Sequence, residues 1–185
     1  MCLMRAKAGN CKKIREVNKM KTAHDWISTL QLQPHPEGGW FKEVYRSSES
    51  IPTEGLPRRF PEARSMATAI YFLLEMDDIS VFHRIKSDET WHFYDGDPLE
   101  IHVIDQDGNY QRNLLGLNPA EGFMPQVTIP HGQWFAARSL GKFTLVGCTV
   151  SPGFDFHDFK MASYIELTNQ FPLHIALIKQ FTKQL

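Results

Sequence analysis

Short runs of alternating apolar and polar residues fill the chain between Trp40 and Val150. Alternation with a period of two is typical of strands that are buried on one face. Asp107-Gly108, between two such runs, predicts a type I′ hairpin turn. Many short strands without strand–helix alternation predict an all-β sandwich or barrel. The predicted strands are 40–46, 66–74, 79–86, 89–95, 98–105, 109–114, 125–130, 133–138 and 142–151, with long loops at 47–64 and 115–124.

Helical spacing occurs only at the two ends of this β region. Thr22 and Asp25 form a capping signature before apolar residues at helical spacing, which predicts a helix over 22–32 that ends before Pro34. Phe171-Pro172 predicts the start of a second helix near the C-terminus. This tail helix is apolar over a wide face, so it needs a partner surface, either the outer wall of the β region or a second subunit.

Composition and charge narrow the class of protein. The chain has 185 residues, 42% of them hydrophobic and 22% charged, with a net charge of -1. These values are typical of one soluble globular domain and exclude a disordered chain. No apolar run approaches the ~18 residues of a membrane helix, and no basic excess indicates nucleic-acid binding. We therefore expect neither a membrane nor a nucleic acid as partner.

The first 20 residues differ from the rest. Residues 1–19 contain six basic residues and one acidic residue, without the apolar core of a secretory signal and without serine. We expect residues 1–20 to be an extension, with Met20 as an alternative start, and residues 21–185 to be a single domain. The only cysteine of that body, Cys148, lies in an apolar run, which indicates a core thiol in a reducing compartment. A cytoplasmic location follows, or a mitochondrial one if residues 1–19 act as a transit peptide.

The densest group of chemically useful side chains lies at residues 82–97. Alternation in the predicted strand 79–86 points His83 inward together with Val81 and Ile85. In the next strand Glu89 lies on the inner face with Trp91 and Phe93, and a hairpin would bring His83 and Glu89 side by side. Such a pair can exchange protons or bind a metal, and it can also be a purely structural hydrogen bond. His92 faces outward unless a bulge intervenes.

A second polar group surrounds the predicted turn at Pro130-His131-Gly132. His131 is expected at an exposed turn tip, and Trp134 and Phe135 are expected in the core. Aromatic walls with a few convergent polar groups are typical of a ligand pocket. We therefore expect a small-molecule pocket lined by His83, Glu89, Trp91, Phe93, Gln133, Phe135 and Ile85.

Both groups resemble the paired motifs of the cupin superfamily. His83, Glu89 and Gly96 match the first histidine, the glutamate and the glycine of the first motif, and Pro130 and Gly132 match the second motif. Ile85 and Phe135 stand where two metal-binding histidines of those motifs would be. The sequence is most similar to one cupin family of unknown function, DUF985, through the segments Pro34-His-Pro-Glu-Gly-Gly-Trp40, Tyr45-Arg-Ser47, Phe82-His83, Ser87-Asp-Glu89, Trp91-His-Phe93, Gly96-Asp-Pro-Leu-Glu100, Leu145-Val-Gly-Cys-Thr-Val150 and Pro152-Gly-Phe154.

The resemblance implies a jelly-roll β-barrel (double-stranded β-helix) and a homodimer. It also implies a fold similar to that of the sugar-nucleotide 3,5-epimerases, which use an inward histidine as a base and need no metal. The likeness concerns the fold, so it bears on function by analogy only.

Three functions remain open at this point. The first is a metal-independent isomerase or epimerase that acts on a small polar metabolite, with His83 as base and Glu89 as its partner. The second is a metalloenzyme in which His83 and Glu89 bind a metal, with His92 or water completing the shell; the apolar Ile85 and Phe135 do not favour a metal cofactor. The third is a binding or storage-like protein without catalytic activity.

Overall fold

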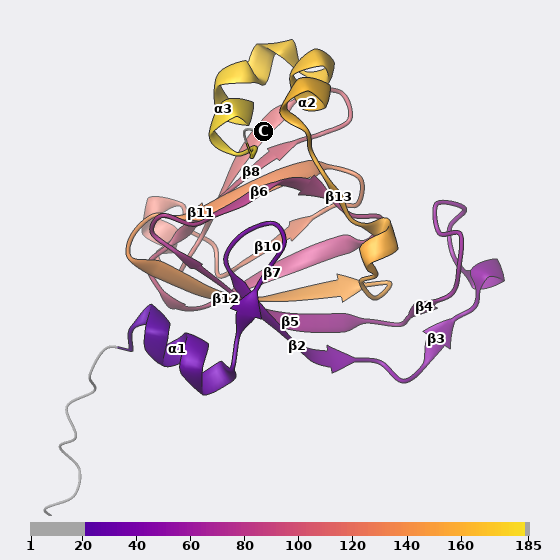
Figure 1. Ribbon diagram of the computed structural model, residues 1–185, viewed down its shortest axis with the longest axis horizontal. Coiled ribbons are helices and arrows are strands. Elements are labelled where there is room, and N and C mark those ends of the chain that lie inside the picture. Colours follow the sequence, from indigo (N-terminus) through magenta and orange to yellow (C-terminus); the bar gives the residue numbers. More distant parts are fainter. Residues whose placement is uncertain (1–20, 184–185) are drawn as a thin grey trace, which may run out of the picture.

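Two antiparallel β-sheets lie face to face in the computed structural model of this chain, which describes residues 21–183 (Figure 1). The predicted extension 1–20 lies outside the described residues. Among residues 21–183 no strand pairing joins the two sheets, so the jelly roll is an open sandwich and does not close into a barrel. The predicted all-β jelly-roll class is confirmed, with this correction to its closure.

Six strands form one sheet and five form the other. In hydrogen-bonding order, the first sheet contains β1 (Gln33–Pro34), β2 (Trp40–Arg46), β5 (Thr68–Glu75), β12 (Phe143–Ser151), β7 (Asp88–Gly96) and β10 (Gln126–Ile129). The second contains β13 (Lys160–Met161), β6 (Ile79–Arg84), β11 (Trp134–Ser139), β8 (Leu99–Ile104) and β9 (Tyr110–Leu115). A small hairpin of β3 (Ser50–Ile51) and β4 (Arg64–Ser65) lies apart.

All nine predicted strands are present, each with ends within two residues of the prediction. Their inner faces form an apolar core that includes Phe72, Trp91, Ile101, Phe135 and Val146. The four short strands β1, β3, β4 and β13 were not predicted, because two residues are too few to show alternation.

Strand β6 contains the largest departure from simple alternation. His83 pairs with Phe135 of β11, but Ser80 already pairs with Ala137, so β6 has one extra residue between them. Such a β-bulge lets Ser80 and His83 share the inner face. Val81, predicted to face inward, instead lines a groove beneath the C-terminal helices, and Phe82 packs in the core on that same side.

The helices cover the outer faces of the two sheets (Figure 1). Helix α1 (Ala23–Leu30) begins at the predicted capping box of Thr22 and Asp25 and packs beside β5 and β12. At the other end of the chain lie α2 (Tyr164–Gln170), a 3-10 turn (Pro172–His174) and α3 (Ile175–Gln180). The prediction placed only one helix here and missed α2.

The apolar tail finds its partner within the same chain. Leu167, Phe171, Ile178 and Phe181 pack against Phe82, Ile104, Trp134 and Ala136 on the outer face of the five-stranded sheet. Part of the apolar tail that suggested a second subunit is therefore covered, whereas Leu173 and Ile175 remain exposed. The homodimer stays a prediction that rests on the family resemblance.

The hairpin between β8 and β9 is present, but its turn is not type I′. Gly108 has a φ of 84°, whereas Asp107 has no positive φ, and a type I′ turn needs positive φ at both central residues. The Gly108 amide donates to the Asp105 carbonyl at 3.2 Å, and Asp105 also accepts from the amides of Asp107 and Asn109. The Asp105 side chain thus holds a longer, three-residue loop.

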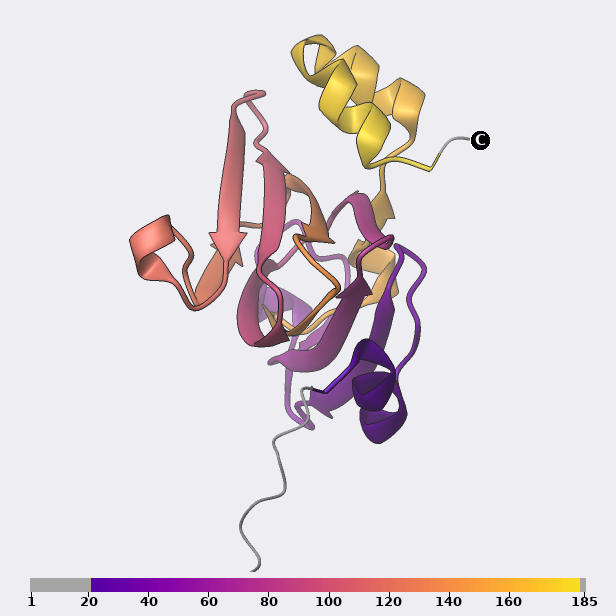
Figure 2. The same cartoon turned by 90° about the vertical axis from the view of Figure 1, so that its left-hand side faces the viewer.

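The 3-10 turn at Pro119–Glu121 and its flanking loop project from one side of the sandwich (Figure 2). Among the described residues, no helix has the length and apolar character needed to cross a membrane.

Candidate functional site

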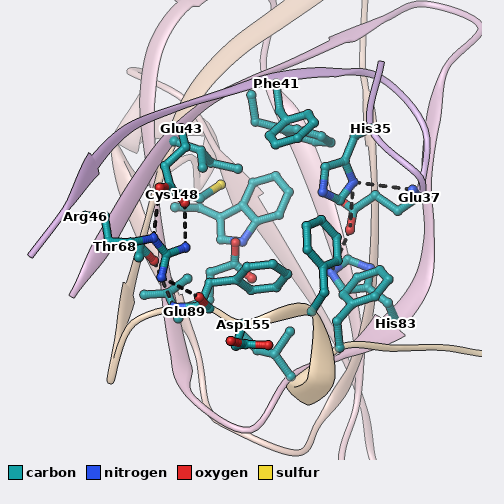
Figure 3. A pocket seen from close by; sticks show the side chains of 18 of the residues that line it. His35, Glu37, Phe41, Glu43, Arg46, Thr68, His83, Glu89, Cys148 and Asp155 are labelled. Atoms are coloured by element: carbon teal, nitrogen blue, oxygen red, sulfur yellow. Dashed lines mark hydrogen bonds and ion pairs between the residues drawn. The ribbon is translucent and has the colours of Figure 1, made fainter. Parts of the chain in front are cut away.

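A cavity of about 350 Å³ lies between the two sheets (Figure 3). The six-stranded sheet contributes side chains from β2, β5, β7 and β12, and β6 contributes His83 from the opposite sheet. The lining residues are His35, Glu37, Phe41, Glu43, Arg46, Thr68, Ile70, Phe72, His83, Ile85, Glu89, Trp91, Cys148, Val150, Phe154, Asp155, Phe156, His157 and Phe159. Just over half of these residues are apolar or aromatic, and they separate the polar groups of the lining from bulk water.

Glu37 reaches this cavity through a glycine turn between β1 and β2. Gly38 and Gly39 have φ values of 115° and 69°. A Cβ atom on Gly38 would lie 2.1 Å from the Ile79 carbonyl oxygen, so only glycine lets the turn approach β6 this closely. The Val81 amide donates to the Glu37 carbonyl at 3.1 Å and fixes the turn to β6.

The Glu37 carboxyl contacts two side chains that share the inner face of β6. The Ser80 hydroxyl donates to Oε1 at 2.8 Å, and Nε2 of His83 lies 3.3 Å from Oε2. Nδ1 of His83 lies 2.8 Å from the Val81 carbonyl oxygen, which can only accept, so Nδ1 carries a proton. A neutral His83 therefore offers an unprotonated Nε2 to Glu37, and the contact requires one proton between the two side chains.

Burial favours the uncharged form of this pair. The Glu37 and His83 side chains are 7% and 3% exposed. Burial lowers the pKa of His83 to about 4, and burial raises the pKa of Glu37. Both shifts favour a neutral imidazole facing a protonated carboxyl at neutral pH. The 3.3 Å separation exceeds that of a tight charge-assisted hydrogen bond, so Nε2 is not locked to Glu37.

A second carboxyl lies across the cavity on β7. Glu89 pairs in register with Val150 of β12, and Trp91 pairs with Cys148. Burial raises the pKa of Glu89 to about 8, and the charge of Glu37 adds to this effect while Cys148 and Trp91 oppose it. Burial likewise raises the pKa of the Cys148 thiol, which makes it a poor nucleophile. In Figure 3, Glu89 and His83 lie on different sides of the cavity.

Aromatic side chains and one ion pair form the rim. The ring of His35 stacks on Phe156 at 6.3 Å and meets Phe159 edge-on at 6.1 Å, and Phe159 also contacts the ring of His83. Arg46 pairs with Glu43 at 2.7 Å and donates to the Phe154 carbonyl. The loop that carries these phenylalanines therefore helps to enclose the space.

The predicted site residues separate into two sets. His83, Glu89, Trp91 and Ile85 line the cavity as expected, but His83 and Glu89 do not form an ion pair and His83 contacts Glu37 instead. Phe93, Gln133 and Phe135 are not among the lining residues: Phe93 packs against the core, and Phe135 lies behind the His83 ring at 4.0 Å. The turn residue Gln133 is half-buried.

The predicted metal ligands do not come together. His92 contacts Thr149 at 3.2 Å; the bulge in β7 comes only at Tyr94, so alternation still points His92 away from Trp91 and the cavity. Ile85 and Phe135 are buried apolar side chains where the cupin motifs would place two histidines. Within residues 21–183 no three His, Cys, Asp or Glu side chains are grouped to hold a metal ion. This donor set does not fit a metal.

Sequence reasoning missed Glu37, which contacts the Nε2 atom of His83 at 3.3 Å. Glu37 lies in an irregular turn 46 positions before His83, where no periodicity predicts which side chain points inward. The segment Pro34–Trp40 was noted only as a mark of family resemblance. Its adjacent glycines were the available signal, because paired glycines indicate a close backbone approach.

Comparisons with known proteins support this architecture. A profile of the Cupin superfamily (DUF985) matches residues 24–162. An uncharacterised protein of Saccharomyces cerevisiae is 29% identical over 143 residues, which cover 71% of each chain.

Solved structures show the same fold. A hypothetical protein from Leishmania major is 38% identical with a TM-score of 0.81, over 89% of this chain and 100% of that one. A protein from Shewanella oneidensis is 36% identical with a TM-score of 0.81, over 90% and 100%. Oxalate decarboxylase from Bacillus subtilis is 13% identical with a TM-score of 0.51, over 80% and 36%, and shares the fold alone. The match over most of the chain, together with the jelly-roll sandwich, establishes that this protein belongs to the DUF985 family of the cupin superfamily.

Proposed function

We propose that the cavity binds a small polar metabolite and catalyses proton transfer at a carbon next to a carbonyl group, as an isomerase or epimerase does. The observation that carries this proposal is the buried Glu37–His83 pair, which faces a second buried carboxyl, Glu89, across a cavity of about 350 Å³. Two proton-exchanging groups on different sides of one carbon are the basic requirement for epimerisation.

His83 takes the proton in this mechanism. Its pKa of about 4 leaves the ring neutral at pH 7, with Nε2 able to accept. An imidazolium formed there would lower the pKa of the adjacent Glu37, which would pass its proton to solvent at the exposed rim of the cavity, and the resulting carboxylate would balance the charge of the ring. Glu37 is thus the orienting partner, a role that the sequence assigned to Glu89.

Glu89 supplies the other proton. Because its pKa is about 8, the carboxyl is protonated at neutral pH and can donate. The catalysed rate should therefore fall as the pH rises above about 8, where Glu89 loses that proton. The apolar walls formed by Phe41, Ile70 and Phe72 exclude water, which strengthens each electrostatic contact inside.

The experiment measures proton exchange with solvent. Small aldoses, ketoses and 2-oxo acids, free and phosphorylated, are incubated with the protein in D₂O, and loss of C–H signals is followed by proton NMR. We expect exchange with the unaltered protein and a loss of about 10²-fold or more in His83→Ala and Glu37→Gln. Exchange that persists in folded His83→Ala would exclude His83 as the base.

A control variant separates charge loss from loss of the site. Glu121→Gln removes one carboxylate in an exposed 3-10 turn outside the cavity and should leave exchange unchanged. A compound that raises the melting temperature but never exchanges a proton would instead indicate a binding protein without catalytic activity.

A further inference from the structure

A second hollow of about 660 Å³ adjoins the cavity at its Ile85 side; we call it the basic groove. The two spaces share Ile85, His157 and Phe159 as lining residues. The basic groove forms where the end of β6, the β8–β9 turn, the β10–β11 turn and the start of β13 converge. Its lining residues are Arg59, Arg84, Ile85, Lys86, Gln106, His131, Gly132, His157, Asp158, Phe159, Lys160 and Gln170.

Positive charge dominates this lining. It includes four side chains that are positively charged at neutral pH and one carboxylate, Asp158. Residues 20–185 carry 14 basic and 20 acidic residues, so the groove gathers positive charge on an acidic body. Positive charge concentrated in a hollow attracts anions and raises their local concentration.

Most of the charges next to the groove are already paired. Asp158 binds the buried Arg64 through both carboxylate oxygens, at 2.6 and 2.9 Å, and it also binds Lys86 at 3.0 Å. Lys160 pairs with Glu166. These contacts leave Asp158 little capacity to neutralise another cation.

Arg59 and Arg84 are different, because no carboxylate of residues 21–183 lies within ion-pair distance of either guanidinium. Hydrogen bonds from His131 outweigh burial and lower the pKa of Asp88, and the charge of Arg59 adds to this effect without forming an ion pair. Each guanidinium is nevertheless held in place. Arg59 lies over the ring of Phe60 at 4.9 Å and donates through Nε to the Lys86 carbonyl at 2.7 Å. Arg84 lies over the ring of Trp134 at 4.6 Å.

Guanidinium groups that are oriented by stacking, with their terminal N–H groups unpaired, fit a tetrahedral oxyanion. A guanidinium presents a planar fork of donors that matches phosphate oxygens two at a time. The amides of Gln106 and Gln170 add neutral donors to the lining. A phosphate monoester carries close to two negative charges at neutral pH and so suits two free guanidinium groups better than a carboxylate does.

We propose that the basic groove binds the phosphate group of a small phosphate ester and that the remainder of the molecule enters the cavity past Ile85 and Phe159. The second half of this inference rests on the proposed function, since it identifies the molecule in the cavity with its substrate. The first half stands on the groove alone.

The test of the first half is titration of inorganic phosphate into the full chain by calorimetry, in a phosphate-free buffer of low ionic strength. We expect binding to the unaltered protein, and affinities about tenfold or more lower in Arg59→Gln and Arg84→Gln. Arg58→Gln is the matched control, because it removes the same charge at a neighbouring position outside the groove, and it should bind phosphate as before.

Further variants guard against indirect effects. Arg59→Lys keeps the charge without the donor fork and should still weaken binding. Circular dichroism melting confirms that each variant is folded. The inference would be overturned if all four arginine variants bound phosphate with the same affinity as the unaltered protein. It would also be overturned if the unaltered protein did not bind phosphate. A further titration compares a (dT)₁₂ oligonucleotide with pyrophosphate. Tighter binding of the oligonucleotide would also overturn the inference, because it would indicate a surface for polynucleotides.

The second half is tested with glycerol 3-phosphate, ribose 5-phosphate and glucose 1-phosphate. At least one should bind more tightly than inorganic phosphate, and His83→Ala should remove that gain while leaving the affinity for inorganic phosphate unchanged. If none binds more tightly, the phosphate ester does not span the two spaces. Loss of inorganic phosphate binding in His83→Ala would place the anion in the cavity and overturn the groove. Failure of proton exchange, by contrast, would leave phosphate binding intact, so the two proposals fail separately.

Discussion

The cavity and the basic groove share part of their lining, but the ionisable groups of the cavity are mostly uncharged and those of the groove are charged. In the cavity, burial shifts the pKa values of Glu37, His83 and Glu89 toward their uncharged forms. In the groove, Arg59 and Arg84 carry the permanent charge of a guanidinium, and they rest on aromatic rings with partial or full exposure to solvent. Neutral groups that can exchange protons suit chemistry, whereas permanent charges suit capture and orientation.

The largest expected effect is on the pH dependence of stability. The Glu89 pKa is about 8 in the folded protein and ordinarily 4.5. Between these values the unfolded carboxyl ionises while the folded one stays protonated, so the unfolded state binds fewer protons and stability falls as the pH rises. Glu89→Gln should therefore gain up to about 5 kcal/mol relative to the unaltered protein at pH 9 and almost nothing at pH 4. Urea unfolding at pH 4, 7 and 9 measures this difference.

The exposed Glu121 gives the reference for that series. Glu121→Gln should shift stability by a similar small amount at all three pH values. His83 changes stability with the opposite sign and over a lower pH range. Its pKa in the folded protein, about 4, lies below the ordinary 6.5, so its contribution to the free energy of unfolding rises as the pH increases from about 4 to 6.5. Parallel pH curves for Glu89→Gln and the unaltered protein would show that the Glu89 pKa is not raised.

A backbone change should affect the cavity without affecting the groove. Gly38→Ala places a Cβ 2.1 Å from the Ile79 carbonyl oxygen at a φ of 115°, so we expect a loss of about 3 kcal/mol and displacement of Glu37. Gly122→Ala has a φ of 84° but no atom within 4 Å of the new Cβ, and it should cost only about 1 kcal/mol. Urea unfolding gives both values. Phosphate affinity should be unchanged in folded Gly38→Ala; a loss would mean that the two regions depend on each other.

Salt concentration should have a moderate effect on phosphate binding in the groove and a smaller effect on proton exchange in the cavity. An increase of NaCl from 50 to 500 mM should weaken phosphate binding by about tenfold, because exposed charges are screened. Proton exchange into an uncharged substrate should change less than about twofold over the same range, since the buried groups are screened much less. Calorimetry and NMR follow the two quantities. Equal sensitivity would remove the contrast between buried and solvated charge.

The smallest effect is expected at the rim. Arg46 and Glu43 are 43% and 40% exposed, and their ion pair should contribute about 0.5 kcal/mol to stability in a double-mutant cycle of Arg46→Gln and Glu43→Gln. A coupling energy above about 2 kcal/mol would mean that this solvated pair behaves like a buried one.

The sequence predicted nine strands well because each of them is long enough to show its period, whereas the four two-residue strands are not. Helix α2 was missed, although Ser163 and Glu166 have the spacing of a capping box and the Ser163 side chain accepts from the Glu166 amide. The tail prediction began at Pro172, which starts only a 3-10 turn. The sequence therefore contains a local signal for the start of α2 at Ser163.

The site was less predictable for two physical reasons. Alternation places His83, Glu89 and Trp91 on inner faces, and the structure agrees. The extra residue in β6 reverses the direction of Val81, and the apolar character of Val81 and Phe82 is compatible with either face. Glu37 arrives through a turn whose geometry depends on contacts with Ile79, a residue distant in sequence.

The β-bulge in β6 also lets neighbouring residues of one strand contribute to two different regions of the protein. Ser80 and His83 serve the cavity, whereas Val81 and Phe82 serve the packing under the C-terminal helices. Substitutions in the helices can be accommodated at Val81 and Phe82 without altering the proton pair. A different C-terminal cap could therefore replace these helices while the Glu37–His83 contact is kept, which makes cap exchange a practical route to new stability.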